Sequence, residues 1–299
     1  MTTGILTQLF GNLNTFLSYA PGADTSVDLD ALNASAIAAR KRIISVITEQ
    51  VYTAIVTAHN GAAFESVLTA IANLTLANQL IFDTVYRKKS ETNIYKYEVE
   101  AMKRGYMENF FNAMDTLLQE LSASPSGEVE ENSESAPSLW KNTRYYSILQ
   151  SCKIPTAEEF DALYPIDLSY LFFFRTIPLQ RESLNERISA YFSRITEDNE
   201  KSVTPLLLLA LAKKTVAKAL RRFDILEFPP TLRNLFDSNT ATRSGKDEHS
   251  QAIELAAQLD AEADELLSTA DAMLTDSSQS DFSTVTSFNR PDDKIISLP

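Results

Sequence analysis

Carboxylates are the side chains of this chain that could do acid–base or metal chemistry, and they gather on two predicted helices. The two groups are Asp260, Glu262, Asp264 and Glu265 on one helix and Glu158, Glu159 and Asp161 on the other. A catalytic acid–base pair needs two carboxyl groups in unlike environments within a cleft. Both groups lie on polar faces opposite apolar stripes, so the pattern favours solvated surfaces over a catalytic pair.

Nucleophile and metal patterns are missing from the sequence. His59, His249 and Cys152 are the only residues of their types and cannot make a Cys/His zinc set. Neither histidine follows a glutamate by three residues, as a ferritin-like di-metal site requires. The phosphate-binding, zinc-protease and hydrolase motifs GxGxxG, GxxxxGK[ST], HExxH and GxSxG do not occur. We therefore expect no catalytic residue, no cofactor and no metal site, and we expect that the protein is not an enzyme.

Basic side chains form the remaining candidate surface. They recur at steps of three and four on one predicted helix, as Lys213, Lys214, Lys218, Arg221 and Arg222, and a second group is Arg40, Lys41 and Arg42. The chain carries a formal net charge of −13, so a basic stripe is a place where an acidic surface of another copy could dock. A solvated face is the plainer interpretation, and both stay open.

Composition limits the partners and the fold. The 299 residues include seven glycines, too few for a hairpin-rich or nucleotide-binding fold. Forty acidic residues against 27 basic ones repel nucleic acid, so at most passing contact with DNA is expected. The single cysteine is typical of a reducing compartment. No secretory signal and no apolar run of about 18 residues is present, so no membrane partner is predicted.

Helices must position these side chains, and two pairs of long helices dominate the pattern. The pairs are predicted at 64–86 with 94–121 and at 203–223 with 249–275. The second helix of each pair carries an apolar stripe on one face. These stripes are Val99, Met102, Tyr106, Phe110, Ala113, Leu117 and Leu121, and then Ile253, Ala256, Leu259, Ala263, Leu266, Ala270 and Leu274. Further helices are expected at 4–18, 30–58 and 178–197, and one short strand at 148–154.

The predicted fold is all-α, with two related antiparallel helical-bundle units. The N-terminal unit spans residues 1–121, an acidic Ser/Pro linker spans 122–147, and the C-terminal unit spans 148–275. Residues 276–299 are expected to form an extended arm that lies across a partner. Its apolar residues Phe282, Phe288, Ile295 and Ile296 are the candidate contacts.

Several segments of the chain resemble one family of proteins from tailed phages and prophages of gut bacteria. In the first half these are IANLTLANQL at Ile71–Leu80 and EVEAMKRGYMENFFNAMDTLLQEL at Glu98–Leu121. In the second half they are SCKIPTAEEF from Ser151, LLLLALAKKTVAKAL, FPPTLRN, AIELAAQLDAEADELLSTADAML and the tail FNRPDDKIISLP. Members of the family are similar to head-to-tail connector proteins, also called neck or adaptor proteins.

The resemblance implies a non-enzymatic structural protein of the virion. Connectors of this kind form homo-oligomeric rings between portal and tail proteins, so it places the chain in the virion neck after assembly in the bacterial host cytoplasm. It carries over no catalytic residues. Two alternatives remain: a cellular helical scaffolding or interaction protein with no virion role, and an enzyme on an all-helical fold, although DDxxD runs are absent.

Overall fold

The structure, a computed structural model, describes residues 4–21, 28–89, 96–123, 135–235 and 248–279. Every element in these ranges is a helix, which confirms the all-α prediction. The strand expected at 148–154 is wrong, because α8 (Arg144–Gln150) includes residues 148–150 and residues 151–154 form turns and bends. The backbone N–H and C=O of Ile154 bond instead to the side chain of Gln180, both at 3.1 Å, so they are satisfied without a partner strand.

The N-terminal region consists of four short helices: α1 (Ile5–Phe10), α2 (Leu13–Tyr19), α3 (Asn33–Ile47) and α4 (Glu49–Ala58). The sequence predicted one helix over 30–58, but the chain breaks at Thr48. This residue has a φ of 77°, which an α-helix cannot contain. The break turns α4 so that it packs against α7 (Ala136–Lys141).

The first long pair consists of α5 (Ala62–Lys89) and α6 (Lys96–Ser122), which pack closely against each other as an antiparallel hairpin. The stripe predicted on α6 is buried from Tyr106 to Leu121, whereas Met102 is exposed. A buried amide joins the hairpin to α2. Asn73 Nδ2 donates to the carbonyl of Tyr19 at 2.8 Å, and Asn73 Oδ1 accepts from Asn109 at 3.1 Å.

The segment predicted as a linker contains folded structure. Residues 124–134 lie outside the described ranges, but α7 and the start of α8 fall within 135–147. Trp140 is buried to 1% exposure, packs edge-on against Phe174, and donates from Nε1 to Ser122 Oγ at 3.3 Å. This part of the chain therefore belongs to the core.

The C-terminal region begins with α9 (Ala157–Leu163), which Thr156 caps by accepting from the N–H of Glu159. It continues as α10 (Tyr170–Ser183), a π-helical turn (Leu184–Ile188) and α11 (Ser189–Phe192), so the helix expected to run past Pro178 exists. Then follow α12 (Glu200–Arg222), a 3₁₀ turn (Ile225–Glu227), α13 (Pro230–Asn234) and α15 (Glu248–Gln279).

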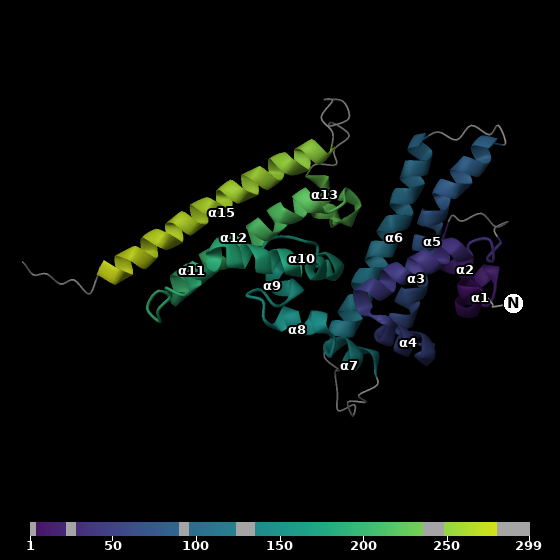
Figure 1. The fold of residues 1–299 in the computed structure, drawn as a ribbon, viewed down its shortest axis with the longest axis horizontal. Coiled ribbons are helices and arrows are strands. Elements are labelled where there is room, and N and C mark those ends of the chain that lie inside the picture. The colour runs from purple at the N-terminus through teal and green to yellow at the C-terminus, as the bar shows by residue number, and fades with distance from the viewer. Residues whose placement is uncertain (1–3, 22–27, 90–95, 124–134, 236–247, 280–299) are drawn as a thin grey trace, which may run out of the picture.

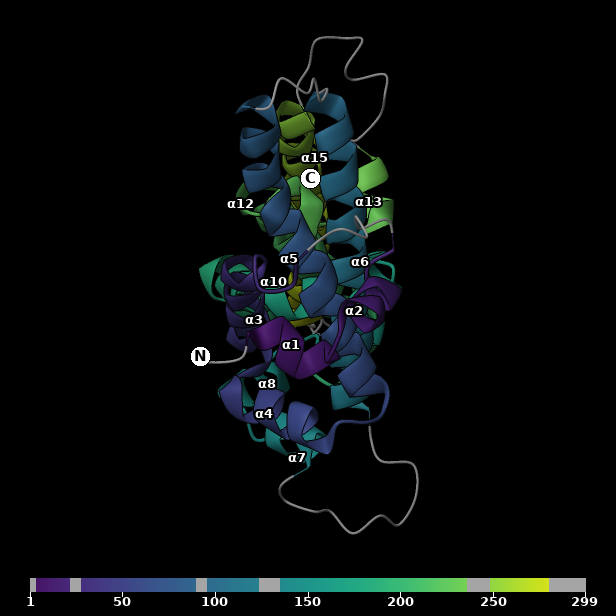
Figure 2. The same cartoon turned by 90° about the vertical axis from the view of Figure 1, so that its right-hand side faces the viewer.

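The second long pair, α12 with α15, extends to the side opposite α5–α6 (Figure 1). The predicted stripe of α15 is buried at Ala256, Leu259, Ala263, Ala270 and Leu274. Two members were wrong by one residue, because Ala252 and Leu267 are buried in place of Ile253 and Leu266, and Ile253 is exposed. Helix α10 lies between the two hairpins (Figure 1) and contacts both α6 and α12. In the end-on view of Figure 2, α15 lies behind α5 and α6. One continuous cluster of buried side chains includes residues from both halves of the chain. The division into two related units stays a prediction.

Candidate docking surfaces

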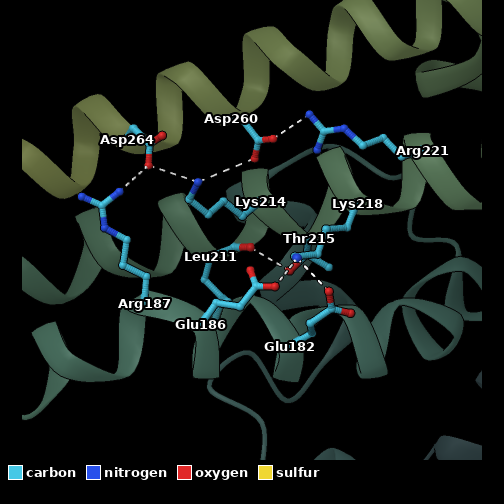
Figure 3. Close-up of polar contacts among 10 residues, drawn as sticks. All are labelled: Glu182, Glu186, Arg187, Leu211, Lys214, Thr215, Lys218, Arg221, Asp260 and Asp264. Atoms are coloured by element: carbon cyan, nitrogen blue, oxygen red, sulfur yellow. Dashed lines mark hydrogen bonds and ion pairs between the residues drawn. The ribbon is translucent and has the colours of Figure 1, made fainter.

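The basic stripe of α12 faces acidic residues of the same chain (Figure 3). On the side of α15, Lys214 lies 3.1 Å from Asp264 and 3.6 Å from Asp260, and Arg221 lies 2.7 Å from Asp260. One turn away, Lys213 pairs with Glu262 at 2.6 Å. The stripe therefore contributes a row of ion pairs along the α12–α15 contact.

On its other side the stripe reaches α10 and the π-helical turn. Lys218 lies 2.9 Å from Glu182 and 2.8 Å from Glu186, and Arg222 bonds Glu182 through both terminal nitrogens at 2.6 and 2.7 Å. The hydrogen bonds from Arg222 and Lys218 lower the pKa of Glu182 to about 2. Burial lowers the pKa of Lys218, but the bonds to Glu186 and Glu182 outweigh it, so the net shift is upward.

These ion pairs give all five basic residues an intramolecular role. Asp260, Glu262 and Asp264 of α15, which the sequence placed on a solvated face, are the partners of Lys213, Lys214 and Arg221. Lys218 and Arg222 pair with Glu182 and Glu186 instead. Docking of another copy on Lys213, Lys214, Lys218, Arg221 and Arg222 stays a prediction, and such a copy would have to compete with the pairs already present.

We expect the pair of Lys214 with Asp264 to contribute only modestly to stability. The side chain of Lys214 is 15% exposed and that of Asp264 is 48% exposed, so water and salt screen their attraction. A double-mutant cycle with Lys214→Met and Asp264→Asn should give a coupling of about 0.5–1 kcal/mol in low salt. The coupling should shrink in 1 M NaCl. A coupling that is unchanged by salt would contradict this account.

An open groove of about 560 Å³ lies where α3, α6, α7 and α10 meet the 3₁₀ turn. Most of its lining is apolar and aromatic, and its residues come from both halves of the chain. They are Arg42, Ser45, Val46, Phe110, Phe111, Trp140, Tyr145, Leu171, Phe174, Arg175, Pro178 and Glu227. The volume is within the range of about 300–1,000 Å³ typical of sites that take small ligands or side chains.

Two arginines and one glutamate charge one side of this groove. Arg42 Nη2 donates to Glu227 Oε1 at 3.2 Å, and Arg175 forms an ion pair with Glu227 Oε2. The Arg42 and Arg175 side chains remain 43% and 39% exposed, whereas that of Glu227 is 13% exposed. The guanidinium of Arg175 also lies 4.9 Å from the ring centre of Phe223. The three side chains together leave one positive charge in excess at the groove.

A second exposed apolar surface lies on the α5–α6 hairpin, towards the ends that face residues 90–95. Phe82 is 61% exposed and Met102 is 47% exposed. Both side chains belong to the α5–α6 hairpin, and neither lines the groove.

The carboxyl group of Asp115 on α6 is largely buried, has a raised pKa and lines a cavity of about 360 Å³. Its Oδ1 accepts from the N–H of Leu171 at 2.8 Å and from Ser169 Oγ at 3.0 Å, so it caps the N-terminus of α10. Burial raises its pKa to about 6, against the opposing effect of these two bonds. Because the α10 terminus occupies its acceptor oxygen, the geometry assigns Asp115 a structural role.

We expect Asp115 to make stability depend on pH. The pKa of this carboxyl is raised in the folded chain, so its contribution is fully present below about pH 4 and is lost as pH rises through about 6. Asp115→Asn keeps an acceptor oxygen but cannot ionise. The free energy of unfolding of the native chain, relative to this variant, should fall by about 1–3 kcal/mol between pH 4 and 7.5.

Urea denaturation of both proteins across that pH range would measure this difference. Asp161→Asn is a useful comparison, since Asp161 also accepts backbone N–H groups, at 2.8 Å from Ile166 and 3.1 Å from Leu168. A difference between native chain and Asp115→Asn that stays constant from pH 4 to 7.5 would rule out a buried titrating carboxyl at Asp115.

The predicted tail contacts Phe282, Phe288, Ile295 and Ile296 lie outside the described residues. The sequence had pointed to Arg42 through its basic neighbours but not to Arg175, Glu227 or Asp115. The groove residues come from segments up to 185 residues apart, so only the fold brings them together.

Comparison of the chain with protein-family models, with curated proteins and with solved structures gives no match. Among the described helices, none combines the length and the apolar character that crossing a bilayer requires. Within the same ranges, no three His, Cys, Asp or Glu side chains are grouped so that they could hold a metal ion.

Proposed function

We propose that the chain is a non-enzymatic structural subunit that docks head to tail with copies of itself and forms a ring. Following the sequence resemblance, this ring is a connector between the portal and the tail of a phage virion. It assembles in the host cytoplasm and is incorporated at the virion neck. Portal and tail proteins are its neighbours on the two sides of the ring.

The observation that carries this proposal is the presence of two unlike apolar surfaces on one chain. Phe82 and Met102 protrude from the α5–α6 hairpin, whereas the groove beside Phe110 and Trp140 is concave. A head-to-tail interface joins two different patches of identical subunits, and it closes into a ring when the rotation divides a full turn. A two-fold dimer, by contrast, uses one self-complementary patch.

The charge of the subunit supports a channel through which DNA passes. With a formal net charge of −13, the chain as a whole repels phosphate. Ion pairs within the chain hold basic side chains against carboxylates, which further reduces the positive charge available to nucleic acid. These include the pairs of Lys213, Lys214, Lys218 and Arg222.

Negative-stain electron microscopy of the purified full-length protein, alone and with a portal protein from the same genome, tests the proposal. Closed rings of one diameter, or a ring added to one face of the portal, are expected. Particles that remain single subunits in both samples would contradict it. If no portal, terminase or capsid gene lies near the gene that encodes this chain, the cellular scaffolding alternative is favoured instead.

A further inference from the structure

We propose that the groove between α3, α6, α7 and α10 binds the C-terminal segment 288–299 of a second copy of this chain. The inference deepens the proposed function, because it names the segment that one subunit inserts into the next. The segment reads FNRPDDKIISLP, in which the acidic pair Asp292–Asp293 stands between Arg290 and Lys294 and is followed by two adjacent isoleucines. The groove offers exposed arginines beside an apolar floor, which are the kinds of surface that carboxylates and isoleucines bind.

The apolar part of the groove suits the isoleucines. Its floor is formed by Phe110, Trp140 and Phe174, which are at most 4% exposed and are therefore fixed by packing from below. Tyr145, on the wall, is 45% exposed. Burying two isoleucine side chains on such a surface removes apolar area from water without any rearrangement of the floor. Ile295 and Ile296 are the residues that would be buried.

The charged side of the groove suits the acidic pair. Arg42 and Arg175 keep about two fifths of their side-chain surface exposed while sharing Glu227 between them. Each guanidinium has more N–H donors than its described contact with Glu227 uses, and a carboxylate is the ligand that such a fork binds best. Asp292 and Asp293 precede the isoleucines by two to four residues, within reach of the same groove.

The direction of α15 favours a second copy over the chain's own tail. Arg221 pairs with Asp260 of α15, and Glu227 of the groove follows Arg221 by six residues in the chain. From Asp260, α15 runs about 30 Å further before it ends at Gln279, away from the groove (Figure 1). The segment from residue 280 to Asp292 can span at most about 45 Å. If it ran back along α15 to the groove of its own chain, it would use most of that length. A neighbouring subunit can present the segment directly.

Site-specific photocrosslinking in the full-length chain tests the inference. A benzophenone side chain replaces Ile296, and the protein is mixed with an equal amount of ¹⁵N-labelled chain before irradiation. Crosslinks between light and heavy chains at peptides that contain Val46, Tyr145 or Phe174 are expected. Arg42→Glu should lower their yield by about tenfold, and Asp292→Lys with Asp293→Lys should restore it. Lys41→Glu is the matched control, an exposed residue of α3 outside the groove lining, and should leave the yield unchanged.

Each other outcome overturns the inference. Crosslinks within one chain only, crosslinks to another surface, or a yield that Arg42→Glu leaves unchanged would exclude this docking mode. A benzophenone at Phe82 that reaches the groove, while one at Ile296 does not, would make the α5–α6 hairpin the occupant. Rings that persist when residues 288–299 are deleted would overturn the tail inference and leave the proposed function intact, whereas loss of self-association under all conditions would overturn the proposed function itself.

Discussion

Trp140→Ala should lower the free energy of unfolding by about 3–5 kcal/mol. The indole is 1% exposed, its ring centre lies 5.2 Å from that of Phe174, and its N–H donates to Ser122. Replacing it with alanine leaves a large cavity among α6, α7 and α10, because the packed helices around it collapse only partly to fill the space. Urea denaturation followed by far-ultraviolet circular dichroism would measure the loss.

Tyr145→Ala provides the comparison for this change. It removes a neighbouring aromatic side chain that is 45% exposed, and its cost should stay below about 1 kcal/mol. Trp140→Phe should retain much of the packing and lose the bond to Ser122. If Trp140→Ala were as mild as Tyr145→Ala, residues 136–141 would act as the linker that the sequence suggested.

Gln180→Leu should cost about 2–5 kcal/mol. Gln180 is 1% exposed, and its amide bonds both backbone groups of Ile154, accepting at Oε1 and donating from Nε2. Leucine fills similar space but leaves a buried N–H and a buried C=O without partners, and each unsatisfied group costs about 1–3 kcal/mol. Chemical denaturation at pH 7 would measure the change.

Gln50→Leu makes the same substitution on the exposed surface of α4 and should alter stability by less than about 0.5 kcal/mol. Gln180→Glu separates the two bonds, since a carboxylate still accepts from the N–H of Ile154 but can no longer donate to its carbonyl. Stability of Gln180→Leu equal to that of the native chain would mean that these backbone groups have other partners.

The sequence predicted those helices and caps whose pattern depends on residues a few positions apart. The stripes of α6 and α15 are regular over several turns, so their buried faces could be read from spacing alone, with shifts of one residue at Ala252 and Leu267. The cap of α9 by Thr156 depends on residues three positions apart and was also predictable. The all-α fold follows from such local patterns and from the few glycines.

The groove and the ion pairs could not be predicted in the same way. Periodicity identifies the face of a helix but not the element that covers it. Arg42 meets Glu227 across 185 residues, and Lys213 meets Glu262 across 49. From the sequence alone, both basic groups were therefore interpreted as exposed surfaces for docking or solvation. In the fold, carboxylates from other elements pair with them. The role of Gln180 could not be predicted for the same reason, because Ile154, to which it is hydrogen-bonded, lies in another segment.

Multi-angle light scattering of the full-length protein over a wide range of concentrations tests self-assembly most directly. The account predicts a single larger species whose mass is a fixed multiple of 33.3 kDa. It also predicts that Phe82→Ser with Met102→Ser, or Arg42→Glu, shifts the protein towards the single-chain mass, whereas Lys41→Glu does not. A mass of 33.3 kDa at every concentration, for the native chain as for its variants, would contradict the claim that the chain docks to copies of itself.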